Sequence, residues 1–286
     1  MNKGTDGELA SMENIPIRRI NRTLKEPDFS ENFNIRDIRT MLSGSDMIQD
    51  LHRHDFFFVL ALVKGAGHHE IDFTLYPVGD NSIFFMRPGQ VHQLTLKAGS
   101  SGYLLGFKKD FCSNDRLSNQ LLRKASSKNL CRLDNKSFKK LLSILTYIFQ
   151  EYSHKPERYQ EVIKLNLAVF FIELVRNHQS SNDSSSRTHS YKLERLEEFL
   201  ELLEMHIADH KQVSHYADVL NFSSYQLNAI TKATLGKTAS EIIDEHTILE
   251  SKRYLLTTSN QVNQIAYHLG YEDVSYFIRF FKRHTV

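Results

Sequence analysis

Alternating apolar and polar positions between residues 50 and 100 predict a set of short antiparallel strands. One face carries His52, His54, Phe56, Phe58, Leu60 and Leu62 before a turn at 64–67, and His69, Ile71, Phe73 and Leu75 after it. Alternation of this kind is typical of strands with one buried face. Pro77, residues 79–81 and Pro88 separate further short strands. Many short strands with regular turns predict a small β-barrel or sandwich.

Helical spacing of apolar residues follows, first over residues 138–152 and then over residues 159–176. The second segment is apolar over a wide arc. Such a helix either buries its whole arc against its own barrel or leaves part of it for a second subunit. The pattern leaves both interpretations open, and the second one predicts a homodimer.

A stretch rich in serine, from Gln179 to His189, separates this α+β half from a half that is entirely helical in pattern. Segments of this composition bury too little apolar surface to offset the entropy of ordering them. We therefore predict a first domain over residues 1–178, a linker over 179–190 and an all-α domain over 191–286.

The helical half contains an internal repeat, in which residues 213–222 match residues 262–271 at an offset of 262 − 213 = 49 positions. The matching positions are Ala217 and Ala266 where two helices cross closely, Asn221 and Gly270 at a turn, and Ser223 and Asp273 as helix N-caps. This is the pattern of a helix-turn-helix unit, present twice. Residues 238–256 predict one long helix that joins the two units.

Composition and charge add little to this picture. The formal net charge of +2 does not point to a nucleic-acid partner. From Tyr191 onward ten basic residues stand against thirteen acidic ones, 10 − 13 = −3, which predicts modest non-specific affinity for DNA with a shallow salt dependence. No apolar run approaches the roughly 20 residues of a membrane span, and no apolar leader opens the chain. We expect no membrane partner, a cytoplasmic location, and free thiols at Cys112 and Cys131.

Residues 264–285 resemble the signature of the AraC/XylS family of transcription regulators, which runs close to IAxxLGFxDxSYFxRxFK. The likeness continues upstream through residues 250–256. More loosely, residues 51–56 and 82–92 are similar to the cupin-like sensor domains of that family. The resemblance implies an N-terminal cupin-like β-barrel with two helices that senses an effector and dimerises. It also implies a C-terminal domain whose two helix-turn-helix units bind DNA.

The same resemblance implies which side chains contact double-stranded DNA. They are Ser224, Tyr225, Gln226, Asn228 and Lys232 in the first unit, and Ser275, Tyr276, Arg279 and Lys282 in the second. Amide and guanidinium groups suit base edges, whereas Lys, Ser and Tyr more often hold phosphates. For each residue, packing or simple solvent exposure stays an open alternative. Relatives continue with a further short helix after Thr285, so we expect a weaker grip from the second unit.

Three histidines of the first domain, His52, His54 and His92, stand where metal-binding cupins keep ligands. Phe58 occupies the place of the carboxylate that such enzymes add. We therefore expect no metal and no cofactor, and a small-molecule effector contacted by His52, His54, Arg87 and His92. The alternative is that the histidines only fill the mouth of the barrel.

The expected function is a sequence-specific transcription regulator, an activator controlled by a small effector and working with RNA polymerase, and not an enzyme. Two alternatives remain open from the sequence. One is a metal-dependent cupin oxygenase with an appended helical domain. The other is a regulator deficient in DNA binding that acts only by pairing with other subunits.

Overall fold

The computed structural model describes residues 17–18, 32–112, 116–179 and 187–285. These residues divide into two compact units, one from Ile17 to Arg187 and one from Thr188 onward. Most of the predicted linker lies outside the described residues, while its last four positions, 187–190, belong to a helix.

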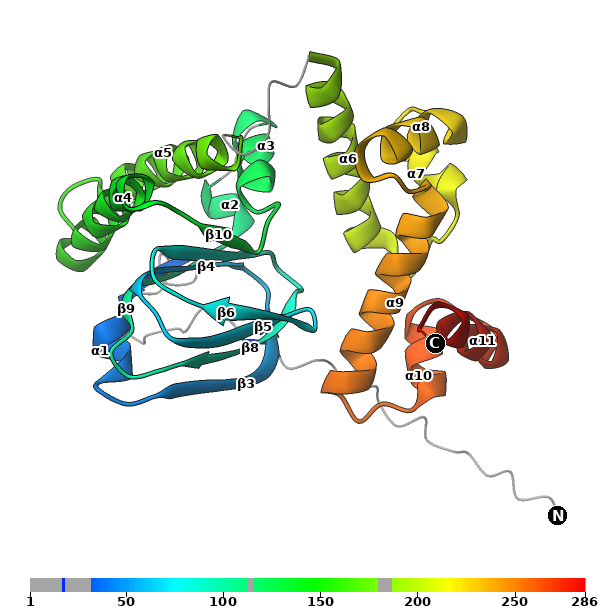
Figure 1. Ribbon diagram of the computed structural model, residues 1–286. Helices are drawn as coiled ribbons and strands as arrows, with labels where there is room; N and C mark the ends of the chain where they lie inside the picture. Colours follow the sequence, from blue (N-terminus) through cyan, green and yellow to red (C-terminus); the bar gives the residue numbers. More distant parts are fainter. Residues whose placement is uncertain (1–16, 19–31, 113–115, 180–186, 286) are drawn as a thin grey trace. The chain divides into compact units, whose positions relative to one another are not determined.

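The first unit is built on two five-stranded sheets (Figure 1). One has the order β1 (Ile17–Arg18), β3 (Met47–His54), β8 (Val91–Leu96), β5 (Gly67–Ile71), β6 (Thr74–Val78), and the other β10 (Leu130–Arg132), β7 (Ser82–Met86), β4 (Phe57–Lys64), β9 (Ser101–Phe107), β2 (Phe33–Asp37). Among these described strands only β1 pairs in parallel, with β3; the other pairs are antiparallel. The expected α+β class with a cupin-like sandwich is confirmed.

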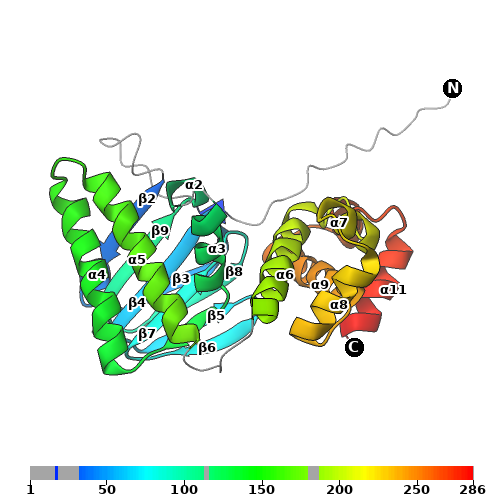
Figure 2. The same cartoon turned by 90° about the horizontal axis from the view of Figure 1, so that it is seen from above.

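Helices cover the outer face of the second sheet (Figure 2). They are α4 (Asn135–His154) and α5 (Tyr159–Gln179), with α2 (Lys109–Cys112) and α3 (Arg116–Ala125) as shorter elements, whereas α1 (Ile38–Leu42) packs Ile38 and Leu42 into the core between the sheets. Strand β4 is therefore buried on both faces: Phe58 and Leu60 pack between the sheets, and Phe57 and Val59 pack under the helices. The alternation pattern had predicted only the first of these two faces.

The prediction that Phe73 and Leu75 continue the inward face of His69 and Ile71 is wrong. Asp72 and Phe73 have φ values of 46° and 64°, and Ile71 pairs directly with Thr74. These two residues form a tight hairpin, a turn that requires positive φ at both central positions. The chain reverses there, so Leu75 is 63 % exposed, while Val78 joins the core.

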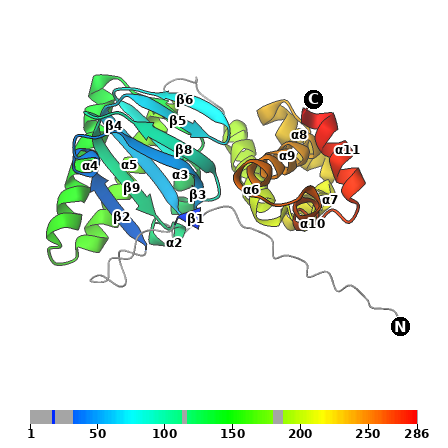
Figure 3. The ribbon, with the colours of Figure 1, turned by 90° about the horizontal axis from the view of Figure 1, so that it is seen from below.

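The second unit is entirely helical in its described part. It comprises α6 (Arg187–His206), α7 (Val213–Val219), α8 (Ser224–Leu235), α9 (Ala239–Thr257), α10 (Val262–His268) and α11 (Val274–Thr285). The long helix α9 runs through the middle of the unit (Figure 3). Its first half packs with α6, α7 and α8 in one core, which includes Phe199, Tyr216, Leu227 and Ile243. The predicted all-α domain with two helix pairs and a joining helix is confirmed.

No helix in the described ranges carries an apolar stretch that is long enough to cross a bilayer. Cys112 and Cys131 are both free thiols. Burial raises the pKa of the Cys112 thiol far above its usual range, with a smaller opposing effect of Lys164, so this thiol stays neutral.

Candidate nucleic-acid interface and buried histidine cluster

The two helix pairs of the second unit are held by their turns and N-caps. Asn221 and Gly270 adopt left-handed conformations, with φ of 58° and 73°, at equivalent positions between the helices of each pair. Ser223 and Gln226 form a capping box on α8. Asp273 caps α11, because its Oδ1 accepts hydrogen bonds from the backbone N–H groups of Ser275 and Tyr276. The turns and caps expected from the repeat are therefore present.

The exposed face of α8 presents four of the five predicted contact residues, namely Ser224, Tyr225, Gln226 and Lys232. Tyr225 is 83 % exposed. Ala229 and Ala233 share this face, so its centre offers only small side chains.

The fifth predicted residue of α8, Asn228, is engaged within the protein. Its Nδ2 donates to the Ser224 carbonyl at 2.9 Å, and its Oδ1 accepts from the Ala239 backbone N–H at 2.9 Å. Asn228 thus ties α8 to the first residue of α9. The family resemblance placed Asn228 among the expected DNA contacts, whereas the structure gives both ends of its amide a partner in the chain.

All four predicted contact residues of α11 are exposed, Ser275, Tyr276, Arg279 and Lys282. Arg283 is also exposed, one helical turn after Arg279, although the sequence analysis did not select it. The spacing i, i+4 from Arg279 was the signal that could have found it. The opposite face of α11 buries Phe277 and Phe280, so the outward arc is polar and basic.

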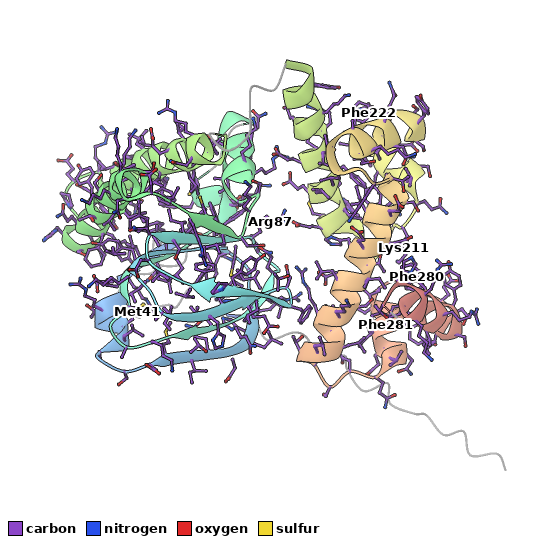
Figure 4. All side chains as sticks on the ribbon, viewed as in Figure 1. Met41, Arg87, Lys211, Phe222, Phe280 and Phe281 are labelled. Carbon is purple, nitrogen blue, oxygen red and sulfur yellow. The ribbon has the colours of Figure 1, made fainter. Side chains whose placement is uncertain are left out.

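Contacts between loops and helices hold the two pairs in one unit. The Lys211 Nζ, labelled in Figure 4, donates to the carbonyls of Ile207 and Ala208 at 3.2 and 3.3 Å and lies 4.7 Å from the ring centre of Tyr271. Partial burial lowers the pKa of Lys211, and Asp209 opposes this effect. The loop before the first pair is in this way packed on the turn of the second.

In the first unit, strand register brings four histidines together. His92 on β8 pairs with His52 on β3 and with Ile71 on β5. All four histidines of the group, His52, His54, His69 and His92, are buried, with at most 7 % exposed. His92 contacts two of the others: its Nδ1 lies 2.8 Å from His69 Nε2, and its Nε2 lies 2.9 Å from His54 Nε2. The sequence placed His69 on this face but did not select it as a site residue.

Burial has a strong effect on His69. Desolvation, followed by the charges of His52 and His54, lowers the pKa of His69 from 6.5 to about 3. Its Nδ1 has no hydrogen-bond partner among the described residues. His69 is therefore neutral at any physiological pH.

Arg87, the fourth predicted effector contact, lies just after β7 and is half-buried (Figure 4). Its backbone N–H donates to Gln90 Oε1 at 2.8 Å, and the Gly89 backbone N–H of the same loop donates to the His54 carbonyl at 2.9 Å. The loop that carries Arg87 is thus attached to the strand that carries His52 and His54.

Two family descriptions match this chain, each over one of the units just described. An AraC-like ligand binding domain matches residues 38–143, and a helix-turn-helix domain matches residues 216–286. The chain belongs to the AraC family of transcription regulators. Because this AraC protein belongs to a non-enzymatic family, the oxygenase alternative is set aside.

Relatives of this AraC protein span most of its length. It is 24 % identical over 241 residues to the uncharacterized HTH-type transcriptional regulator YdeC of Bacillus subtilis, with 82 % of each chain covered. It is 21 % identical over 240 residues to the HTH-type transcriptional activator RhaR of Mannheimia succiniciproducens, with 79 % of this chain and 80 % of the relative covered. Among solved structures, fatty acid-bound ToxT of Vibrio cholerae is 18 % identical, with 88 % and 91 % of the two chains covered and a TM-score of 0.41.

Proposed function

We propose that this AraC family regulator acts in the cytoplasm as a homodimeric, effector-controlled activator of transcription. A bound effector changes the fraction of dimers whose helix-turn-helix units reach their two half-sites together, since linking two binding modules raises their joint affinity. RNA polymerase is the partner that such an activator recruits. Activation rather than repression is supported by one relative, RhaR, whose name describes it as a transcriptional activator.

The observation that carries the DNA-binding part is the pair of outward helix faces. On α8 and α11 the apolar residues Leu227 and Phe277 are buried, while Lys232, Arg279 and Lys282 project on the opposite side. A helix with this division can lie in the major groove with its polar side toward base edges and phosphates. We assign base contact to Arg279 and phosphate contact to the two lysines.

Substitution of Arg279 by alanine is expected to weaken specific DNA binding by about 1–3 kcal/mol, roughly 10- to 100-fold. The test is fluorescence anisotropy on a duplex enriched from a random library by the purified protein. Lys192→Ala is the matched control, because it removes one positive charge from α6, which carries no proposed contact residue. Equal losses in the two variants, or none in either, would contradict the proposed contact.

The homodimer is supported by an apolar stripe on α5. Leu165, Val169 and Ile172 are spaced by four and three residues on one side of the helix, and Leu165 is 68 % exposed. Ile163 and Phe170 on the other side pack on the barrel. The helix thus buries only part of its apolar arc within its own chain, and we propose that a second copy covers the rest.

A double variant with Leu165→Lys and Val169→Lys is expected to sediment as a monomer at concentrations where the unmodified protein is a dimer. Charges at these positions cannot be buried between two apolar helices without a large desolvation cost. The control is Lys164→Glu, an exposed charge change on the same helix at a position about 100° round from Leu165 and outside the stripe. A variant that remains dimeric in analytical ultracentrifugation would place the interface elsewhere.

The effector part of the proposal rests on the buried polar cluster in the barrel. His52, His54 and His92 form a polar group among the apolar side chains between the sheets, and Arg87 lies in the adjoining loop. A small number of convergent polar groups in an apolar surrounding is typical of a ligand site.

A further inference from the structure

We propose that the effector recognised by the barrel is a divalent transition-metal ion, bound by the Nε2 atoms of His52, His54 and His92. This inference rests on the proposed effector function of the same cluster and replaces the expectation that no metal is held there. His69, which does not itself bind the ion, orients His92.

The three ligand nitrogens are already close to one another. One nitrogen from each of His52, His54 and His92 lies within 4.8 Å of the other two. Nitrogens bound to one zinc ion at about 2.0–2.1 Å are separated by roughly 3.4 Å in tetrahedral geometry. Small side-chain rotations therefore bring the cluster to binding geometry, with no movement of the strands.

Hydrogen bonds at the far side of the rings favour the metal-binding tautomers. The His52 Nδ1 lies 2.6 Å from the Asp50 carbonyl oxygen, which only accepts, so Nδ1 carries the proton and Nε2 carries the lone pair. His92 Nδ1 can donate in the same way to His69 Nε2, 2.8 Å away. A metal-ligating histidine characteristically donates its second ring N–H to such a partner.

The contact between His92 and His54 shows what the ion replaces. Their Nε2 atoms are 2.9 Å apart, so one of the two nitrogens carries a proton and donates it to the lone pair of the other. Because His92 carries its proton on Nδ1, the proton between the two rings belongs to His54 Nε2; for both Nε2 lone pairs to bind an ion, the neutral His54 ring carries its proton on Nδ1 instead, and no net proton is released.

The ligand set selects the class of ion. Three neutral imidazoles suit zinc, nickel, copper and cobalt, whereas magnesium and calcium require oxygen ligands. The histidine group includes no carboxylate within the described part of the chain. A fourth position is left for water or a small anion, as in other three-histidine sites.

Packing around the cluster favours an ion over a larger organic ligand. The His54 ring centre lies 4.3 Å from that of Phe56 and 5.4 Å from that of Phe58, and the His69 ring centre lies 4.9 Å from that of Phe84. An ion needs only the space of the proton between His54 and His92 and a small rotation of the rings. A ligand of many atoms has to displace these aromatic side chains.

The test uses the full-length protein, freed of metal by a chelator and titrated with Zn²⁺ or Co²⁺. We expect one equivalent bound per chain, a Co²⁺ visible spectrum of tetrahedral nitrogen coordination, and a change of at least tenfold in affinity for the selected duplex. His69→Gln is expected to weaken metal binding 10- to 100-fold without abolishing it. Because DNA affinity of the metal-free protein is measured separately, failure of the metal site leaves the DNA-binding proposal intact.

Two variants identify the site. His52→Gln and His54→Gln are each expected to lose stoichiometric binding, while His68→Gln, an exposed neighbour, and His210→Gln, in the other unit, retain it. X-ray absorption of the unmodified zinc protein should show three imidazole ligands, a readout that does not depend on the variants folding. The proposal is overturned if no equivalent is bound, if the His210→Gln variant alone loses it, or if bound metal leaves DNA affinity unchanged.

Discussion

Replacement of Gly270 by alanine is expected to destabilise the helical unit by about 2–5 kcal/mol and to abolish specific DNA binding. A Cβ atom at this position would lie 2.0 Å from the Ala208 carbonyl oxygen, in a backbone conformation with φ of 73°. The left-handed conformation alone costs a residue with a side chain about 1–2 kcal/mol, and overpacking adds about 1–3 kcal/mol. The Ala208 carbonyl cannot simply move away, because it also accepts a hydrogen bond from Lys211.

The matched control for this prediction is Gly236→Ala in the same unit. Gly236 has nearly the same conformation, φ 72°, but no atom lies within 4 Å of its added Cβ. We expect a loss of only about 1 kcal/mol there. Urea denaturation of both variants measures the difference, and similar losses would show that the contact with Ala208 is unimportant. Gly270→Asn should destabilise the helical unit as much as Gly270→Ala, because its Cβ meets the same Ala208 carbonyl oxygen, although Asn221 occupies the equivalent turn of the first pair.

Acidification is expected to destabilise the barrel strongly through His69. The pKa of His69 is about 3 in the folded state, compared with 6.5 for an ordinary histidine such as that of the unfolded chain. Between these two pH values the unfolded chain therefore binds a proton at His69 and the folded chain does not. Stability is therefore complete above pH 6.5 and falls by about 1.4 kcal/mol per pH unit as the pH drops toward 3. At pH 4.5 the loss from this one residue reaches about 3 kcal/mol.

The measurement is denaturant unfolding of the chelator-treated protein between pH 7 and 4. His69→Leu should reduce the slope of stability against pH by about one proton, because an apolar side chain does not titrate. His68→Gln changes the adjacent, exposed histidine and should leave the slope as it is. An identical pH dependence in the unmodified protein and in His69→Leu would mean that another group causes the acid sensitivity.

Features with local causes were predictable from the sequence. The N-caps Ser223 and Asp273 and the turn residues Asn221 and Gly270 satisfy backbone requirements within a few residues of themselves. The duplicated pattern made them visible twice. The inward face of β4 could be predicted for a similar reason, because its period of two is set by the strand itself.

Features that depend on distant partners were not predictable. Asn228 has its structural role because Ala239, eleven residues later, brings a backbone N–H to it. His69 joins His92 only through the register of β5 and β8. The second buried face of β4 requires the cover of α4 and α5. The hairpin at Asp72 and Phe73 lacks glycine, so the alternation appeared to run through it.

The small side chains on the outer face of α8 have a consequence for the promoters that this regulator controls. Ala229 and Ala233 can make van der Waals contact with bases but no hydrogen bond, and the Oε1 of Gln226 already accepts from the Ser223 backbone N–H in the capping box. By contrast, α11 offers a guanidinium group that can pair with guanine. Aligned natural binding sites are therefore expected to show one short block of strongly constrained base pairs. A neighbouring block, about one turn of the duplex away, should tolerate most substitutions.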